Sequence, residues 1–200
     1  MTPNRITRGG AARRAPFIAV AVLLAALALV ACGSEGGETT TAVPDKAADA
    51  EILNNVLARE LAAIDAYERT LPLLRGPALA SAREFRAQEQ EHVDAIVKAL
   101  RGLGEPAEPE QEEIESDDLK TEAEALEFIY EVESVSVAGN LRAISHLTAP
   151  WPRSLLGSIA ANQAQHLVVL RRALGADLSE AIPRAFEDGT APSPSETMAE

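Results

Sequence analysis

Six polar residues recur at helical spacing inside apolar stretches, and all six have side chains that can bind metal ions. They form two sets, Glu60 with Glu89-x-x-His92 and Glu133 with Gln163-x-x-His166. Glu60 and Glu89 are 29 positions apart, and Glu133 and Gln163 are 30 positions apart. A two-metal carboxylate site in a helical bundle takes one Glu from each of two helices and a Glu-x-x-His pair from each of two others. The spacing therefore predicts a metal site built by four helices, with one ligand changed to Gln163.

The three Glu residues of these sets have apolar neighbours at positions that share their helix face. Glu60, for example, has Val56, Leu57 and Ile64 around it. A Glu in such a stripe is expected to be buried, and an unpaired buried carboxylate costs several kcal/mol. A cation between the helices would neutralise these charges.

Each His lies three residues after an oxygen ligand, so the pair lies on one helix face, one turn apart. Carboxylate and imidazole together suit iron, manganese or zinc. A single Glu-x-x-His is weak evidence in a Glu-rich chain, because exposed carboxylates are common. The repeat strengthens it, since two of only three His residues, His92 and His166, occupy matching positions.

Apolar residues at helical spacing predict four helices around these ligands. We expect them over roughly 48–73, 77–103, 121–147 and 153–174, with a capping box at Thr121 and Glu124 and a stop at Gly104. Segment 105–118 is rich in Pro and Glu and is too long for a tight turn, so it should cross the surface. The predicted fold is all-α, a ferritin-like four-helix bundle with two helix pairs joined by a long crossover.

The N-terminal stretch predicts export. Four Arg residues precede an apolar run from about Phe17 to Val30, which is too short to favour a retained membrane span. The Leu-Val-Ala-Cys32 tetrad resembles the lipobox of bacterial lipoproteins, and a lipid on Cys32 would hold the protein on the outer face of the bacterial cell membrane. The alternative is an ordinary signal peptide with an incidental cysteine. Export could follow the general or the twin-arginine route, the latter suggested by Arg13-Arg14.

Four parts follow from this organisation: a lipoprotein signal peptide (1–31), a lipidated Cys with a flexible tether (32–48), the bundle (49–176) and a C-terminal tail (177–200). Removing 1–31 removes four Arg and no acid, so the net charge moves from −13 to −17. Nucleic acid is therefore an unfavourable partner. The membrane is the expected one, through Cys32, and a homodimer stays open.

Three segments are similar to a ferritin-like domain of the bacterial lipoprotein kind: Glu60-Leu-Ala-Ala-Ile-Asp-Ala-Tyr67, Gln88-Glu-Gln-Glu-His92, and Ala161-Asn-Gln-Ala-Gln-His166 with the residues up to Gly175. The resemblance covers about residues 48–176. It implies a bundle that often houses two bridged metal ions, commonly iron, able to react with oxygen or peroxide. It assigns the single-helix carboxylates to Glu60 and Glu133 and the first Glu-x-x-His to Glu89 and His92.

The second motif departs from this pattern, because Gln163 stands where the family has Glu. An amide can coordinate through its oxygen but brings no charge, so two divalent ions with three carboxylates would leave the site at +1. Asn140 also stands where the repeat of Tyr67 falls. Three alternatives stay open: a mononuclear site, a weakened dinuclear site and a metal-free polar network. In the network, Arg86 could pair with Glu89, and Gln163 could join a carboxylate to an imidazole.

Two functions follow from these alternatives. In the first, the protein binds one or two metal ions, iron before manganese or zinc, and at most acts as a ferroxidase or a peroxide-reactive site. In the second, it is a non-catalytic envelope scaffold or partner-binding lipoprotein with a degenerate site and no cofactor. Gln163 is the residue that favours the second.

Overall fold

The chain forms four long helices and one short one in the part that the structure, a computed structural model, describes: residues 43–110, 114, 118–184 and 188–189. The helices are α1 (Lys46–Thr70), α2 (Gly76–Leu103), α3 (Glu122–His146), α4 (Pro150–Ala173) and α5 (Leu178–Ala181). The all-α, four-helix prediction is confirmed. The predicted signal peptide and Cys32 lie outside the described residues.

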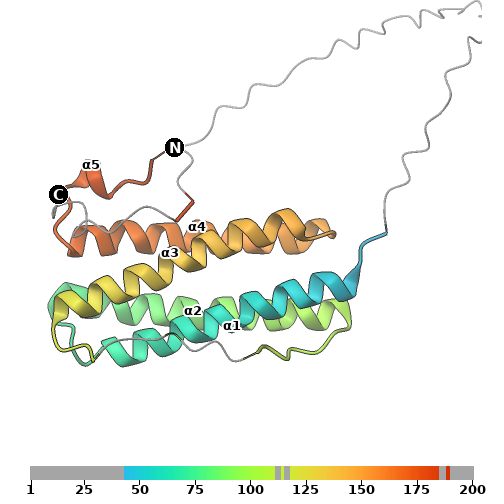
Figure 1. Cartoon of the computed structure of the whole chain (residues 1–200), viewed down its shortest axis with the longest axis horizontal. Coiled ribbons are helices and arrows are strands. Elements are labelled where there is room, and N and C mark those ends of the chain that lie inside the picture. The colour runs from blue at the N-terminus through green and yellow to red at the C-terminus, as the bar shows by residue number, and fades with distance from the viewer. Residues whose placement is uncertain (1–42, 111–113, 115–117, 185–187, 190–200) are drawn as a thin grey trace, which may run out of the picture. The chain divides into compact units, whose positions relative to one another are not determined.

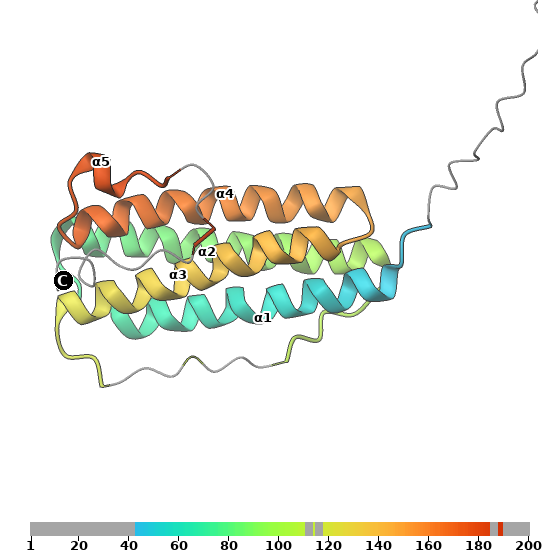
Figure 2. The ribbon, with the colours of Figure 1, turned by 45° about the horizontal axis from the view of Figure 1, so that its top comes forward.

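The long helices form two antiparallel pairs, α1 with α2 and α3 with α4, as Figure 1 shows. Contacts between α1 and α3 and between α2 and α4 close the bundle. Helix α2 ends at one end of the bundle and α3 begins at the other, so the connection between them returns over the length of the bundle (Figure 2). It brings the start of α3 to the α1–α2 turn, where the Arg75 backbone N–H donates to Glu122 Oε1 at 2.9 Å. The chain order thus places all four ligand-bearing helices around one axis.

Local signals account for most helix ends. The predicted capping box is present, since Thr121 accepts from the Glu124 backbone N–H and the Glu124 side chain accepts from that of Thr121. Gly104 ends α2 in the left-handed conformation at φ 85°, which glycine adopts without a Cβ clash. Helix α4 begins three residues earlier than predicted, because Pro150 is well tolerated in a first turn that needs no N–H donor.

The start of α1 corrects one predicted boundary. Residues 46–48, assigned to the tether, are helical. Asp45 is the N-cap, and its side chain accepts from the Ala48 backbone N–H at 3.1 Å. The Asp45 N–H in turn donates to Thr148 Oγ1 at 2.9 Å. A side-chain cap and a tertiary contact therefore order a segment whose composition predicted flexibility.

Hydrogen bonds hold the crossover to α1 along the bundle. Asn54 Nδ2 donates to the Pro106 carbonyl at 3.2 Å, and its Oδ1 accepts from the Glu108 backbone N–H at 2.9 Å. Farther along α1, Arg69 donates to the Ile114 carbonyl at 3.2 Å. The predicted surface connection therefore contacts α1 near both of its ends.

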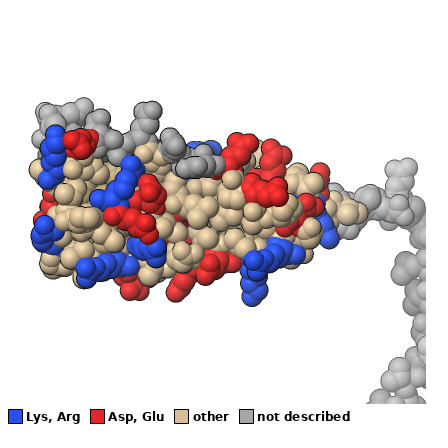
Figure 3. All heavy atoms as spheres, turned by 90° about the horizontal axis from the view of Figure 1, so that it is seen from below, with Lys and Arg blue, Asp and Glu red and all other residues tan. Residues whose placement is uncertain are grey.

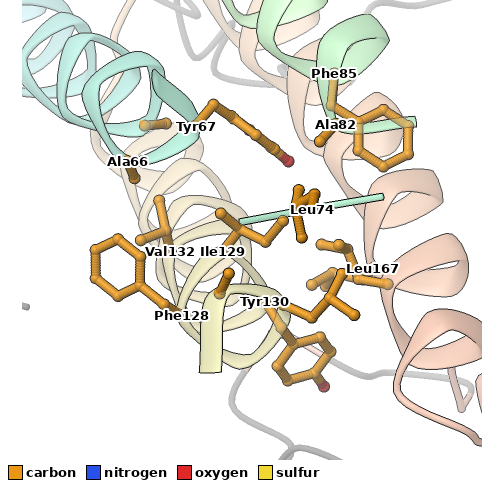
Figure 4. Close-up of a cluster of buried hydrophobic side chains, with 14 of the residues drawn as sticks. Ala66, Tyr67, Leu74, Ala82, Phe85, Phe128, Ile129, Tyr130, Val132 and Leu167 are labelled. Carbon is orange, nitrogen blue, oxygen red and sulfur yellow. The ribbon is translucent and has the colours of Figure 1, made fainter. Parts of the chain in front are cut away.

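Two apolar clusters fill the bundle, one on each side of the polar residues. One contains Leu53, Leu57, Val93, Ile96, Leu156 and Ile159, and the other contains Tyr67, Phe85, Ile129, Leu167 and Leu170. Figure 4 shows part of the second cluster, with side chains of several helices pointing toward one another. On three of the helices, the members of one cluster come before a polar residue in the sequence and the members of the other come after it. These polar residues are Glu60, Glu89 and Gln163. Apolar packing therefore separates the polar layer from water at both ends.

The surface is charged but mixed. On the face shown in Figure 3, the Lys and Arg side chains have Asp and Glu side chains close by, with other residue types between them. Within the described part of the chain, no helix combines the length and apolar character needed to cross a bilayer.

Candidate metal centre

The bundle brings all six predicted ligands into one buried layer. Helix α1 supplies Glu60, α2 supplies Glu89 and His92, α3 supplies Glu133, and α4 supplies Gln163 and His166. The three carboxylates and the amide have no exposed surface, and the two imidazoles are at most 9 % exposed. Spacing along each helix explains why these side chains face inward, and their convergence follows from the packing of the four helices.

Two overlapping groups of metal-binding atoms share Glu89. The first comprises Glu60, Glu89 and His92, and the second Glu89, Glu133 and His166; in each, the candidate ligand atoms lie within 4.8 Å of one another. His92 Nδ1 lies 3.1 Å from Glu89 Oε2 and 3.2 Å from Glu60 Oε2. A carboxylate common to both groups is in the position that a bridging ligand takes.

The second imidazole is arranged in the same way. His166 Nδ1 lies 2.9 Å from Glu133 Oε1 and 3.4 Å from Glu89 Oε1. Its ring stacks on Phe85 with 4.0 Å between the centroids. Both imidazoles therefore present the same nitrogen, Nδ1, to the carboxylates, as two equivalent metal ligands would.

An outer hydrogen bond fixes the proton on His166. Its Nε2 lies 2.7 Å from Gln88 Oε1, and Asn162 Nδ2 donates to that same oxygen at 3.1 Å. The Gln88 amide nitrogen donates to Glu84, a carboxylate that can only accept, so the amide oxygen must face His166. Nε2 therefore carries a proton, which leaves Nδ1 as the nitrogen that can bind a metal.

Gln163 contacts two of the carboxylates through its amide nitrogen. Nε2 lies 3.0 Å from Glu60 Oε2 and 3.3 Å from Glu89 Oε2. Its oxygen accepts from Asn140 Nδ2 at 2.9 Å, and Asn140 Nδ2 also lies 3.3 Å from Glu60 Oε1. The sequence-based suggestion that Gln163 joins a carboxylate to an imidazole is thus corrected, because its donor group is used by two carboxylates.

Arg86 does not take part in the centre. Its guanidinium pairs with Glu68 at 2.6 Å on the surface. The suggested pair with Glu89 is therefore wrong: Glu89 faces the bundle axis, where the two imidazoles are its cationic neighbours.

Tyr67 adds a neutral donor to the layer. Its hydroxyl donates to Glu133 Oε1 at 2.5 Å. Burial, together with the nearby Glu133 charge, raises the pKa of Tyr67 well above its usual value. The phenol therefore stays protonated and remains a hydrogen-bond donor to Glu133.

The imidazoles balance the carboxylates in the metal-free centre. Burial alone would lower the pKa of both His residues, but hydrogen bonds to the carboxylates outweigh it and raise the pKa of His92 to about 10 and that of His166 to about 9. Burial raises the pKa of Glu60 to about 7. Burial acts in the same direction on Glu89, but its interactions with the His166 and His92 imidazoles bring its pKa below the usual value. At neutral pH two imidazolium ions therefore occupy the place of external cations.

The donor set nonetheless offers a metal ion an oxygen that no hydrogen bond occupies. Glu133 Oε2 is buried and accepts no hydrogen bond in the described structure, which is unusual for a carboxylate oxygen. Two carboxylates and an imidazole Nδ1 suit a divalent ion of the iron, manganese or zinc type. The residues present fit such an ion, with Gln163 as the one departure from a four-carboxylate centre.

Comparison with protein families matches residues 48–176 to the ferritin-like domain family. The chain belongs to this family. The match spans α1 to α4 and includes all six residues of the centre. No curated protein sequence matches the chain.

Solved structures share the ferritin-like fold at low sequence identity. A conserved hypothetical protein of Mycobacterium tuberculosis aligns with a TM-score of 0.59 and 18% identity over 65% of this chain and 99% of that one. A ferritin-like diiron-carboxylate protein of Bacillus anthracis aligns with a TM-score of 0.53 and 21% identity over 65% of this chain and 97% of that one. Rhodobacter capsulatus bacterioferritin, whose dinuclear site was metal-free, aligns with a TM-score of 0.56 and 21% identity over 66% of this chain and 86% of that one.

Several functional neighbours were not among the predicted site residues of this ferritin-like domain. The sequence marks Asn140 only as a break in the repeat, and Gln88 and Asn162 lie in segments that resemble the family without any role assigned to them. Their contacts span up to 80 residues of sequence. A helical-wheel comparison with Glu60 and Glu133 could have placed Asn140 on the inner face, but its partners depend on helix packing.

Proposed function

We propose that this ferritin-like protein binds one or two divalent metal ions, iron first among them, in the polar layer of its bundle. The observation that carries the proposal is the pair of buried carboxylate-imidazole groups that share Glu89. Glu60, Glu89, His92, Glu133 and His166 would bind the metal directly, and Gln163 could do so only by turning its amide oxygen inward. Iron bound there would supply the electrons for reduction of oxygen or peroxide.

The chain's own residues would prepare this chemistry. Gln88 orients His166, and the Tyr67 hydroxyl holds Glu133. Apolar clusters on both sides restrict water. Because both Nδ1 atoms must lose their protons to bind a metal, occupation of the centre releases protons from His92 and His166.

Metal analysis of the purified protein tests this proposal. After loading with Fe²⁺ under anaerobic conditions and removal of free metal, we expect stoichiometric iron in the wild type and loss of it in the His92→Ala/His166→Ala double variant. His146→Ala is the matched control, since His146 is exposed at the end of α3 and far from the ligands in sequence. A helical circular dichroism spectrum must be retained by each variant. Iron-free wild type, or equal iron in the double variant, contradicts the proposal.

A second candidate function rests on the amide network. Gln163 and Asn140 already satisfy much of the hydrogen-bonding capacity of Glu60, and two imidazolium ions offset the charge of two of the three carboxylates. A centre of this kind is stable without metal, so the protein would then serve as a non-catalytic envelope scaffold or partner-binding lipoprotein. The absence of iron from the wild type, with stability unaffected by added metal, would favour this function.

We further propose that the protein is exported and held on the outer face of the cell membrane by a lipid on Cys32. Support comes from the Arg-rich start, the apolar run and the Leu-Val-Ala-Cys32 tetrad. Cys32→Ser tests it. We expect the wild type in the detergent phase of a detergent partition and the variant in the aqueous phase. Identical partitioning of the two proteins would refute the anchor.

A further inference from the structure

The proposed metal centre has two halves that the structure treats differently. We propose that one divalent ion binds tightly between Glu89, Glu133 and His166, and that the Gln163 and Asn140 amides block the Glu60, Glu89 and His92 half against a second ion. This inference rests on the proposed metal-binding function and states where the metal goes.

The orientation of the Gln163 amide follows from its neighbours. Gln163 presents Nε2 to both oxygens of Glu60 and to Glu89 Oε2, whereas the reversed amide would place its own oxygen against these carboxylate oxygens. Its oxygen then points to Asn140, whose amide nitrogen donates to it and also lies 3.3 Å from Glu60 Oε1. Both oxygens of Glu60 therefore face amide N–H groups, which a metal ion would have to displace.

The other half has free acceptors. Glu133 Oε1 accepts from Tyr67, but Glu133 Oε2 is buried without a hydrogen-bond partner in the described structure. Glu89 Oε1 likewise accepts no hydrogen bond there and lies 3.4 Å from His166 Nδ1. An ion between these atoms meets two carboxylate oxygens and one imidazole nitrogen without displacing any amide.

The internal repeat shows how this asymmetry arises. Tyr67 lies seven residues after Glu60 on α1 and contacts Glu133 on α3, whereas Asn140 lies seven residues after Glu133 and contacts Glu60. The two positions are equivalent, and each side chain donates to the carboxylate of the other helix. A phenol has one hydrogen to donate, but the Asn140 amide has two and so links Glu60 to Gln163.

Charge acts in the same direction. Glu89 and Glu133 together neutralise one divalent ion. A second ion would have only one further carboxylate as a ligand, Glu60. It would also meet the positive end of the Gln163 amide, at the position where a four-carboxylate centre has a Glu. Two cations that share one bridging carboxylate also repel each other at short range. The second ion is therefore expected to bind on the order of 100-fold more weakly than the first.

Cobalt(II) is a suitable probe, because it binds the same ligand types and can be located by anomalous scattering. Calorimetric titration of the purified protein should show one tight ion, and anomalous maps of cobalt-loaded crystals should place it beside His166. Glu133→Gln should lose the tight ion. Glu60→Gln should lose only the weak second one.

Replacing the amide tests the block directly. Gln163→Glu should raise the number of tightly bound ions from one to two. Gln165→Glu is the matched control, because Gln165 lies two residues farther along α4 with an exposed side chain, and the added charge should leave the stoichiometry at one. Circular dichroism shows whether each variant remains folded.

The outcomes separate this inference from the proposed function. A wild-type ion beside His92, or two ions of equal affinity, would overturn the asymmetric centre while the metal-binding function stands. If Gln163→Glu also keeps a single tight ion, the amide is not the block and the inference fails. Failure of both the wild type and Gln163→Glu to bind cobalt would overturn the metal-binding function itself.

Discussion

The amide nitrogen of Gln163 lies 3.0 Å from Glu60 Oε2 and 3.2 Å from Glu60 Oε1, although 103 residues separate the two in sequence. The amide replaces a carboxylate with a donor, and it therefore stabilises a buried group that would otherwise face a second negative charge. The same contact that weakens a second metal site favours the metal-free fold.

Gln163→Glu should therefore destabilise the metal-free protein. The change removes the Nε2 group that contacts both oxygens of Glu60 and places a fourth carboxyl among three others, so we expect the free energy of unfolding to fall by about 1–3 kcal/mol in the presence of a chelator. Urea denaturation at pH 7 measures it. Gln165→Glu, on the exposed face of α4, should stay within about 0.5 kcal/mol of the wild type. Equal stability of the two variants would contradict the structural role given to the amide.

The stability of the metal-free protein should fall as the pH rises from about 6.5 to 10. His92 and His166 have pKa values raised to about 10 and about 9, so the folded state binds more protons than the unfolded state across this range. Glu60, with its pKa raised to about 7, acts in the same direction at lower pH. Thermal melts in a chelator at pH 6, 8 and 10 measure the slope.

Two further samples check the origin of this pH dependence. His92→Gln/His166→Gln should flatten the slope, whereas His146→Ala should retain it. With metal present, the stabilisation by the metal should instead increase with pH, because the metal displaces protons from both imidazoles. A melting temperature that rises with pH in the metal-free wild type would show that the imidazoles are not held as cations.

Asp49 should be a main stabilising residue of the bundle end. Its buried carboxylate accepts from the backbone N–H groups of Thr148 and Ala149, at 2.6 and 2.9 Å, and from Thr148 Oγ1. Ala149 is the N-cap of α4 and has no capping side chain, so Asp49 of α1 supplies an acceptor there. Asp49→Ala should cost about 2–4 kcal/mol in urea denaturation. The exposed Asp94→Ala on α2 serves as control, and a loss no larger than its own would refute this role.

Gln88 should tune metal affinity without contacting the metal. Gln88→Leu removes the acceptor that holds the Nε2 proton of His166, and loss of such an outer partner typically costs about 10–100-fold in affinity. Calorimetric titration with cobalt(II) measures it. Gln90→Leu on the same helix removes only a contact with Asp94 and should leave affinity unchanged. A Gln88→Leu protein with reduced stability but unaltered affinity would show a packing role instead.

Local sequence accounts for the features whose partners are close in the chain. Helical spacing placed Glu60, Glu89, Glu133 and Gln163 on inward faces, and the capping box at Thr121 and Glu124 formed as predicted. These features depend on one helix at a time, since a period of 3.6 residues and a side-chain cap need no information about other helices. The internal repeat added the pairing of Glu-x-x-His motifs and so the candidate ligand set.

Other relationships were decided only when the helices packed. The contacts of Asn140 with Glu60, of Asp49 with Ala149 and of Gln88 with His166 span about 80 to 100 residues. Whether Arg86 faced Glu89 or Glu68 likewise depended on the position of α1 beside α2. The sequence by itself determined a four-helix bundle with a layer of metal-binding side chains. The tertiary structure decided which carboxylate is shared, which oxygens the amides occupy and which remain free, because hydrogen bonds across a bundle depend on the rotation and axial offset of each helix against its neighbours.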